Sequence, residues 1–233
     1  MATVVFLIPT FLAEDFHDVL PESALEIVRE IDEFVVENEK TARAFLKKIG
    51  TKIPQSQFVF HELNEHSDAK SISELASLLR KDKSIGLMSE AGCPAVADPG
   101  SEFVRMAHEQ NIKVVPLIGP SSMLMALMSS GMNGQSFCFH GYLPRESIQR
   151  KQKLKELEKD AIKKNQTQLF IETPYRNQQM LGDILESLDN KTRLCIAFEL
   201  TSKDEFIRTK SIHDWKTQKI DFHKKPAVFL IGK

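Results

Sequence analysis

The stretch of sequence that decides the fold runs Ile85-Gly86-Leu87-Met88-Ser89-Glu90-Ala91-Gly92-Cys93-Pro94-Ala95-Val96-Ala97-Asp98-Pro99-Gly100. Its beginning, 85–88, predicts a short buried strand, 102–110 predicts a helix, and 113–118 predicts a second strand. Strand, helix and strand in this order are typical of a parallel sheet that helices cover on both faces. The segment 89–100 therefore follows the carboxyl end of a parallel strand, which is where such sheets bind ligands.

Working outward, the pattern of strands and helices predicts an α/β protein with two domains, 1–118 and 119–233. In the first domain we expect a mostly parallel sheet, with strands at 3–8, 34–36, 57–63, 85–88 and 113–118, and helices at 21–34, 40–49, 71–81 and 102–110. In the second domain we expect a partly antiparallel sheet, with strands at 137–142, 167–172, 193–200, 205–209 and 227–232, and helices at 121–130, 148–164 and 177–188.

Composition excludes several classes of protein. The 233 residues are 42% hydrophobic and 27% charged, which is typical of a globular chain and not of a disordered one. A formal net charge of −1 excludes a strongly basic protein that coats nucleic acid, although a local basic patch is compatible with it. The stretch 114–144 has no charged residue, but prolines and glycines interrupt it, so we expect no membrane span. Cys93, Cys138 and Cys195 form no C-x-x-C pair, which argues against a disulfide framework or a zinc ribbon and favours a cytoplasmic location.

Two loops are candidates for ligand binding. Glu90 and Asp98 bracket 89–100, although Asp98 is equally typical of a residue that starts a turn, with Ser101 capping the next helix. Gly119-Pro120-Ser121-Ser122 opens the following helix, where free N–H groups either hold an anion or belong to an ordinary helix start. Neither loop matches G-x-G-x-x-G or a P-loop, so the usual nucleotide-binding fingerprints are absent from the sequence.

Further candidates lie in the second half. Glu172 and Glu199 lie at the carboxyl ends of predicted strands, and each is either a site residue or the partner of a neighbouring lysine. The basic segment 145–164 is either a solvated helix face or a contact for nucleic-acid phosphates. A methionine cluster indicates either core packing or a pliable apolar wall, and consists of Met123, Met125, Met128 and Met132. His61 and His66 are five residues apart, which does not match a zinc-binding helix, and we expect no metal site.

Several motifs, taken together, resemble one family. The chain contains Ile8-Pro9-Thr10, the segment 89–100, Ile118-Gly119-Pro120-Ser121, Phe139-His140-Gly141-Tyr142-Leu143-Pro144, Ile171-Glu172-Thr173-Pro174-Tyr175-Arg176 and Phe198-Glu199-Leu200-Thr201. These motifs, in this order, resemble the tetrapyrrole (corrin/porphyrin) methylase superfamily. Within it, they are most similar to the bacterial branch that methylates a ribose 2′-hydroxyl of small-subunit ribosomal RNA.

The resemblance implies two α/β domains with a cofactor cleft between them, S-adenosylmethionine as cofactor, and a homodimer. It implies cofactor contacts from Pro9, Ala91, Gly92, Cys93, Pro94, Val96, Ala97, Asp98, Gly119, Pro120, Ser121, Ser122, Ile171, Glu172, Ala227 and Val228. As residues that position the acceptor or take its proton, we expect Glu90, Glu172 and Glu199. For contacts with the substrate, we expect Arg145, Arg150, Lys151 and Arg176.

The leading hypothesis is therefore an S-adenosylmethionine-dependent methyltransferase that acts on ribosomal RNA. The alternatives are a methylase of a small acceptor such as a tetrapyrrole, and a non-catalytic S-adenosylmethionine-binding module. The chain departs from the branch at 11–15, at Glu37-Asn38-Glu39-Lys40, and at Glu90 and Ser202. The sequence stops at Lys233, directly after the last predicted strand, so we expect a short form that lacks the family's C-terminal extension. The departures in the first loop and at the end bear on the substrate more than on the cofactor.

Overall fold

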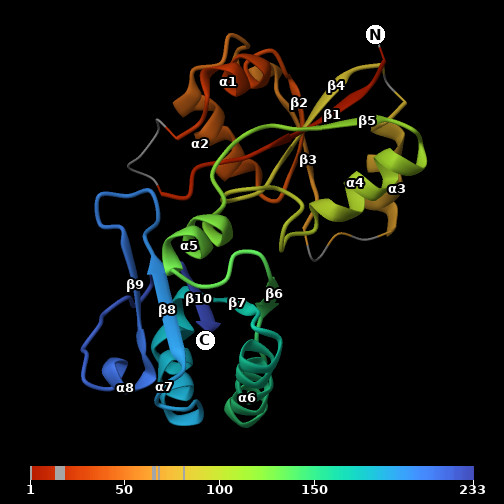
Figure 1. The fold of residues 1–233 in the computed structure, drawn as a ribbon. Helices are drawn as coiled ribbons and strands as arrows, with labels where there is room; N and C mark the ends of the chain where they lie inside the picture. Colours follow the sequence, from red (N-terminus) through yellow and green to blue (C-terminus); the bar gives the residue numbers. More distant parts are fainter. Residues whose placement is uncertain (1, 14–18, 65–66, 68, 81) are drawn as a thin grey trace. The chain divides into compact units, whose positions relative to one another are not determined.

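A computed structural model describes residues 2–13, 19–64, 67, 69–80 and 82–233 (Figure 1). The chain forms two compact units, Met1–Ser121 and Ser122–Lys233, and each is described here by itself. Part of the departing loop at 11–15, and His66, lie outside the described residues. None of the helices that the described residues form has the length and apolar character needed to span a bilayer.

The first unit is built on a parallel sheet, as the sequence predicts. Its strands are β1 (Val4–Ile8), β2 (Glu33–Val36), β3 (Val59–Glu62), β4 (Ser84–Met88) and β5 (Lys113–Pro116), in the order β3-β2-β4-β1-β5. All the pairings are parallel. The carboxyl ends of the three central strands β2, β4 and β1 therefore meet at one edge, and the segment 89–100 begins there.

Helices bury both faces of this sheet (Figure 1). Helices α1 (Glu22–Val28) and α2 (Glu39–Ile49) pack against one face, and α3 (Ala69–Leu78) and α4 (Gly100–Glu109) pack against the other. Alternate residues of β2 serve the two cores, because Phe34 and Val36 pack with α1 and α2 while Val35 packs with α3 and α4. A short 3-10 turn, Gln55–Gln57, precedes β3.

The helix expected over 21–34 is too long. Helix α1 ends at Val28, and Glu33–Val36 form β2 instead. Phe34, Val35 and Val36 are all buried between strands β3 and β4, a position that favours β-branched and aromatic residues in an extended backbone. The strand expected at 34–36 is therefore confirmed, and the helix prediction is wrong only beyond Val28.

The second unit has a mixed sheet. Its strands are β6 (Phe137–Tyr142), β7 (Thr167–Glu172), β8 (Arg193–Phe198), β9 (Phe206–Ser211) and β10 (Ala227–Gly232), in the order β6-β7-β10-β8-β9. Strands β6 and β7 are parallel and the other pairings are antiparallel. The register places Ala227 opposite Glu172 on one side and opposite Phe198 on the other. One edge therefore gathers the carboxyl ends of β7 and β8 and the start of β10.

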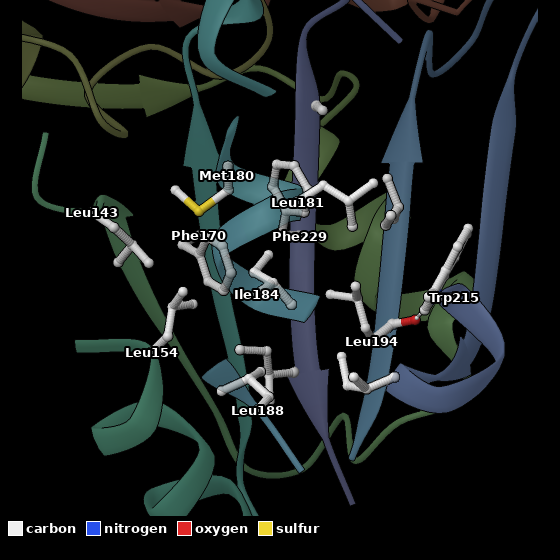
Figure 2. Close-up of a cluster of buried hydrophobic side chains, with 14 of the residues drawn as sticks. Leu143, Leu154, Phe170, Met180, Leu181, Ile184, Leu188, Leu194, Trp215 and Phe229 are labelled. Atoms are coloured by element: carbon white, nitrogen blue, oxygen red, sulfur yellow. Dashed lines mark hydrogen bonds between the residues drawn. The ribbon is translucent and has the colours of Figure 1, made fainter. Parts of the chain in front are cut away.

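Helices α6 (Ser147–Lys164) and α7 (Asn177–Ser187) cover one face of this sheet and bury the core drawn in Figure 2. Leu154 of α6, Met180 and Ile184 of α7, and Phe170 and Phe229 of the sheet belong to it. A one-turn helix that the sequence analysis missed, α8 (Ile212–Trp215), adds Trp215, whose ring N–H donates to the carbonyl of Leu194 at 2.8 Å.

Helix α5 (Ser122–Ser130) contacts strands β8, β9 and β10. Its methionines do not behave as one group. The side chain of Met132, just after the helix, packs beside Gly232, and Met123 and Met125 are half-buried. Met128 is 82% exposed, so the interpretation as core packing does not hold for this residue.

Candidate functional site

In the first unit, three segments expected to bind the cofactor come together. Thr10 forms an isolated antiparallel bridge with Gly92, and its N–H donates to the Gly92 carbonyl at 2.9 Å. The thiol of Cys93 donates to the carbonyl of Pro120 at 3.4 Å. The structure thus joins the end of β1, the segment 89–100 and the turn that precedes α5 at the carboxyl edge of the sheet. Burial raises the pKa of the Cys93 thiol, so the side chain is neutral near pH 7.

Gly119 packs tightly against Pro9, at the end of β1. A Cβ atom on Gly119 would lie 2.4 Å from both Cβ and Cγ of Pro9, and 2.9 Å from Cδ2 of Leu20. A proline ring is rigid and sits on the backbone, so it cannot turn away from such a contact. The close approach of the two chain segments therefore requires glycine at this position.

We expect Gly119→Ala to lower the free energy of unfolding by about 1–3 kcal/mol, the usual cost of overpacking. The measurement is urea denaturation of the variant beside Gly134→Ala. Gly134 is the matched control, because a Cβ there would meet nothing within 4 Å. Equal stability of the two variants would show that the contact between Gly119 and Pro9 is not tight.

The segment 94–100 is held by one carboxylate. Asp98 Oδ1 accepts hydrogen bonds from the N–H groups of Ala95 at 2.9 Å and Gly100 at 2.7 Å. Burial raises the pKa of Asp98, and these two hydrogen bonds partly oppose the rise. Helix α4 begins at Gly100, so Asp98 holds its first N–H and Ser101, the expected cap, lies inside the helix.

Ala95 and Ala97 have φ angles of +63° and +62°. Alanine rarely adopts this conformation, which costs about 1 kcal/mol or more and is characteristic of functional loops. The side chains of Ala91 and Val96 are exposed, whereas Pro94 is buried. The segment therefore combines a fixed backbone with exposed positions on the carboxyl edge of the sheet, as a ligand-binding loop requires.

Two residues at this edge were not among the expected site residues. Glu37 follows β2, and its Oε2 accepts the backbone N–H of Glu90 at 3.1 Å. Thr10 Oγ1 donates to the carbonyl of Ser89 at 3.3 Å. The signal that could have found Glu37 is its place directly after a predicted parallel strand, the same rule that pointed to Glu90. Glu90 itself is exposed.

In the second unit, Glu172 is a buried carboxylate at the gathered edge of the sheet. Its Oε1 accepts from the Thr173 N–H at 2.6 Å and from Arg176 Nη2 at 2.5 Å. Arg176 also donates from Nε to Thr173 Oγ1 at 3.1 Å. Oε2 is buried and has no hydrogen-bond partner among the residues that the structure describes. Burying an acceptor without a hydrogen-bond donor costs the folded protein several kcal/mol, because the group has lost its hydrogen bonds to water.

Other expected residues share this edge. Ala227 and Val228 are buried, and Ala227 pairs with Glu172 and Phe198. Glu199 directly follows β8 in a turn, with a φ angle of +53°, and its carbonyl accepts the Ser202 N–H at 3.0 Å. The second unit therefore brings Glu172, Ala227 and Glu199 to one side of its sheet. Ile171 pairs with Val228 one residue further into the sheet.

The basic residues expected to contact substrate differ sharply in their environments. Arg150 is buried, donates from Nε to Asp183 Oδ2 at 2.6 Å, and donates from Nη1 to the carbonyls of Pro144 and Arg145. This burial contradicts the expectation of a substrate contact, because the guanidinium is enclosed in the fold and paired there with Asp183 and two backbone carbonyls. Lys151 is paired with Glu186 at 2.7 Å, and Arg145 is exposed.

Helix α6 has one exposed basic face. Lys155, Lys159 and Lys163 are four residues apart, so they lie on the same side of the helix, and all three are exposed. Because α6 connects two parallel strands, its first turn is near the carboxyl edge of β7 and its last turn is at the opposite edge. Along a helix of this length the two ends are separated by about 27 Å. Arg145, just before α6, therefore lies near the edge of the sheet that carries Glu172, whereas Lys163 lies near the opposite edge.

Comparison with known proteins identifies relatives over most of the chain. The family model of tetrapyrrole (corrin/porphyrin) methylases matches residues 17–214. Ribosomal RNA small subunit methyltransferase I of Vibrio cholerae is 33% identical over 207 residues, covering 89% of this chain and 68% of the relative. The protein of the same name from Thermotoga maritima is 35% identical over 188 residues, covering 80% of each.

Solved structures share the fold at low sequence identity. The methyltransferase CobJ superposes with a TM-score of 0.63 at 15% identity, over 100% of this chain and 93% of its own. Uroporphyrin-III-C-methyltransferase from Thermus thermophilus gives a TM-score of 0.56 at 15% identity, over 99% and 94%. These likenesses bear on the fold alone.

Proposed function

The chain belongs to the tetrapyrrole (corrin/porphyrin) methylases and is an S-adenosylmethionine-dependent methyltransferase, and from this premise we propose that it methylates a ribose hydroxyl of small-subunit ribosomal RNA. The observation that carries the proposal is the likeness to relatives named ribosomal RNA small subunit methyltransferase I, which extends over 89% of this chain in the Vibrio cholerae case. The ribose hydroxyl is the acceptor that the motifs of this branch imply.

One buried group among the described residues fits the cofactor. Glu172 Oε2 is a buried acceptor without a partner among the residues described, and S-adenosylmethionine carries donors that suit it, an ammonium group and a ribose diol. In the first unit, a Cβ at Gly92 would lie 3.0 Å from Leu12 Cδ2 and 3.5 Å from the Pro120 carbonyl, so the backbone there lies close against its neighbours. We infer that 91–98 and 119–122 contact the cofactor through backbone groups.

When bound, S-adenosylmethionine supplies an electrophilic methyl group on a sulfonium. Held by Glu172 and by the backbone of 91–98, it would supply that methyl group to the acceptor oxygen, and the hydroxyl proton would have to be taken up. What the chain supplies is orientation and a place for that proton. Glu90, Glu172 and Glu199 remain the groups that we propose for these roles. The backbone N–H of Glu90 donates to Glu37, and its carboxylate is exposed to solvent, where it can meet the acceptor.

For RNA, we propose phosphate contacts from Arg145 and from the exposed face of α6 formed by Lys155, Lys159 and Lys163. A chain with a net charge of −1 depends on such local basic surfaces. The homodimer, and domains bounded at 118 and 119, also stay predictions.

A transfer assay tests this function. The protein is incubated with tritium-labelled S-adenosylmethionine and offered undermethylated small ribosomal subunits beside a porphyrin precursor. We expect label in the ribosomal RNA, located on a ribose by nuclease digestion. Label only in the porphyrin would overturn the RNA assignment in favour of a small acceptor. Binding of the cofactor with label in neither would indicate a binding module, and unchanged transfer after alanine replacement of all three glutamates would remove their proposed role.

A further inference from the structure

We propose that Tyr175, His223 and Lys224 form a platform on which the protein stacks an unpaired base of its RNA substrate. The proposal rests on the proposed function and names the part of the surface that recognises single-stranded RNA. It adds a role for the segment 216–226 before β10, which none of the expected sites included.

The platform is an exposed aromatic pair with a cation beside it. Tyr175 is 72% exposed, although its ring lies edge-to-face with His223, with centroids 6.2 Å apart. The Nζ atom of Lys224 lies 5.8 Å from the centroid of the Tyr175 ring. Base stacking on single-stranded nucleic acid uses this combination of an exposed aromatic ring and a neighbouring cation.

The surrounding charge favours a polyanion. Lys219, Lys224 and Lys225 surround Asp221 in the segment 219–225, which is basic in a chain whose overall net charge is −1. Lys219 and Lys224 are exposed, and Lys225 lies with its Nζ atom 5.4 Å from the centroid of Phe198. Phosphates on either side of a stacked base would meet these lysines.

Hydrogen bonds join the two chain segments that carry the platform. The Lys224 N–H donates to the carbonyl of Pro174 at 3.2 Å, which joins the residue before Tyr175 to the segment that carries His223. Asn177 Nδ2 donates to the Lys225 carbonyl at 2.6 Å, and Phe222 is fully buried beneath. A surface already fixed in its binding conformation loses little entropy when RNA binds.

Its position suits an acceptor site. Tyr175 is three residues beyond Glu172, and the segment with Lys224 leads directly into Ala227, which pairs with Glu172. The platform therefore adjoins the edge where Glu172 Oε2 has no partner among the residues described. A base stacked there would place its nucleotide chain beside the reaction.

The test measures binding and transfer separately. Fluorescence anisotropy with a labelled single-stranded RNA oligonucleotide of mixed sequence gives the affinity of the whole chain and of Tyr175→Ala, Tyr175→Phe and Lys224→Ala. Phe137→Ala and Lys191→Ala are the matched controls, since Phe137 is 44% exposed and Lys191 is exposed, both at the opposite edge of the sheet. Transfer to undermethylated small ribosomal subunits gives KM and kcat.

We expect Tyr175→Ala to weaken oligonucleotide binding and raise KM about tenfold, the scale of one lost stacked base, with kcat and cofactor affinity unchanged. Tyr175→Phe should bind within about twofold of the unaltered chain, because the stacking face remains. Lys224→Ala should weaken binding and reduce its dependence on salt. If Tyr175→Ala and Phe137→Ala bound the oligonucleotide equally well, and the unaltered chain still methylated the subunits, the platform alone would be overturned. If the unaltered chain transferred no methyl group to the subunits, the proposed function would be overturned. Preference for a duplex of the same sequence would also overturn the platform.

Discussion

Replacing Asp183 with alanine should lower the free energy of unfolding by about 3–5 kcal/mol, since it leaves the buried Arg150 guanidinium without its counterion. Asp183 Oδ2 accepts from Arg150 Nε at 2.6 Å and forms an ion pair with Nη2, and Oδ1 accepts from Ser147 at 2.9 Å. The carbonyls of Pro144 and Arg145 would remain as partners, but neither carries a charge.

Urea denaturation followed by tryptophan fluorescence measures this effect directly. The single tryptophan, Trp215, is buried in the core of the same unit (Figure 2). Glu186→Ala is the control, because it removes only the exposed pair with Lys151 and should change stability little. A double variant, Arg150→Met with Asp183→Leu, should recover most of the loss, since apolar residues of similar volume replace a buried pair well. A midpoint for Asp183→Ala equal to that of Glu186→Ala would contradict the structural role given to Arg150.

Arg150 also illustrates where sequence patterns stop being informative. A run of basic residues on a predicted helix carries no sign of which member turns inward. The partner of Arg150 is 33 positions away on α7, and local spacing cannot indicate a contact of that separation. The exposed stripe of Lys155, Lys159 and Lys163, in contrast, follows from helical spacing once the buried Leu154 and Leu157 define the inner face.

The fold itself could be predicted well because its signals are local. The strands 137–142, 167–172 and 227–232 are short apolar or β-branched runs with clear ends, and they form as expected. The helix over 40–49 ends at Gly50, whose φ angle of +70° suits glycine. The strand expected at 34–36 forms as β2, so the error over 21–34 is confined to the residues after Val28, where Ile31 continues the helical spacing of Leu25 and Val28 although the helix has ended.

Some residues of the candidate site could likewise be predicted from local sequence, and others could not. The rule that ligands bind at carboxyl ends of strands led to Glu90 and Glu172, and applied once more it would have led to Glu37. Tyr175 and Lys224 could not be paired from the sequence, because their contact depends on how the segment before β10 folds back onto Pro174. Among the described residues, Glu172 Oε2 has no hydrogen-bond partner, and this can be recognised only from the structure, where Oε1 accepts from Thr173 and Arg176.

That atom gives the second large expected effect. Glu172→Gln should weaken S-adenosylmethionine binding about 10- to 100-fold, which corresponds to the loss of one hydrogen bond to a charged group, about 1.5–3 kcal/mol. The amide keeps the shape of the side chain and one acceptor oxygen. In one orientation its NH₂ group replaces Oε2 and meets the donor of the cofactor, and in the other it faces the N–H of Thr173 and the guanidinium of Arg176. Either orientation places donors against donors.

Isothermal titration measures the affinity, with Glu186→Gln as the control, because Glu186 is an exposed glutamate of the same unit whose partner, Lys151, is also on the surface. Thermal unfolding without cofactor establishes that Glu172→Gln is folded, since Arg176 is partly solvated and tolerates the lost charge. Transfer kinetics then separate two roles for the carboxylate. A fall in affinity at constant kcat places Oε2 on the cofactor, whereas constant affinity with kcat reduced by about 100-fold or more would assign Glu172 to the proton of the acceptor instead. If both affinity and kcat matched those of Glu186→Gln, Glu172 would have no part in the site, and the burial of Oε2 without a partner among the described residues would require another explanation within the fold.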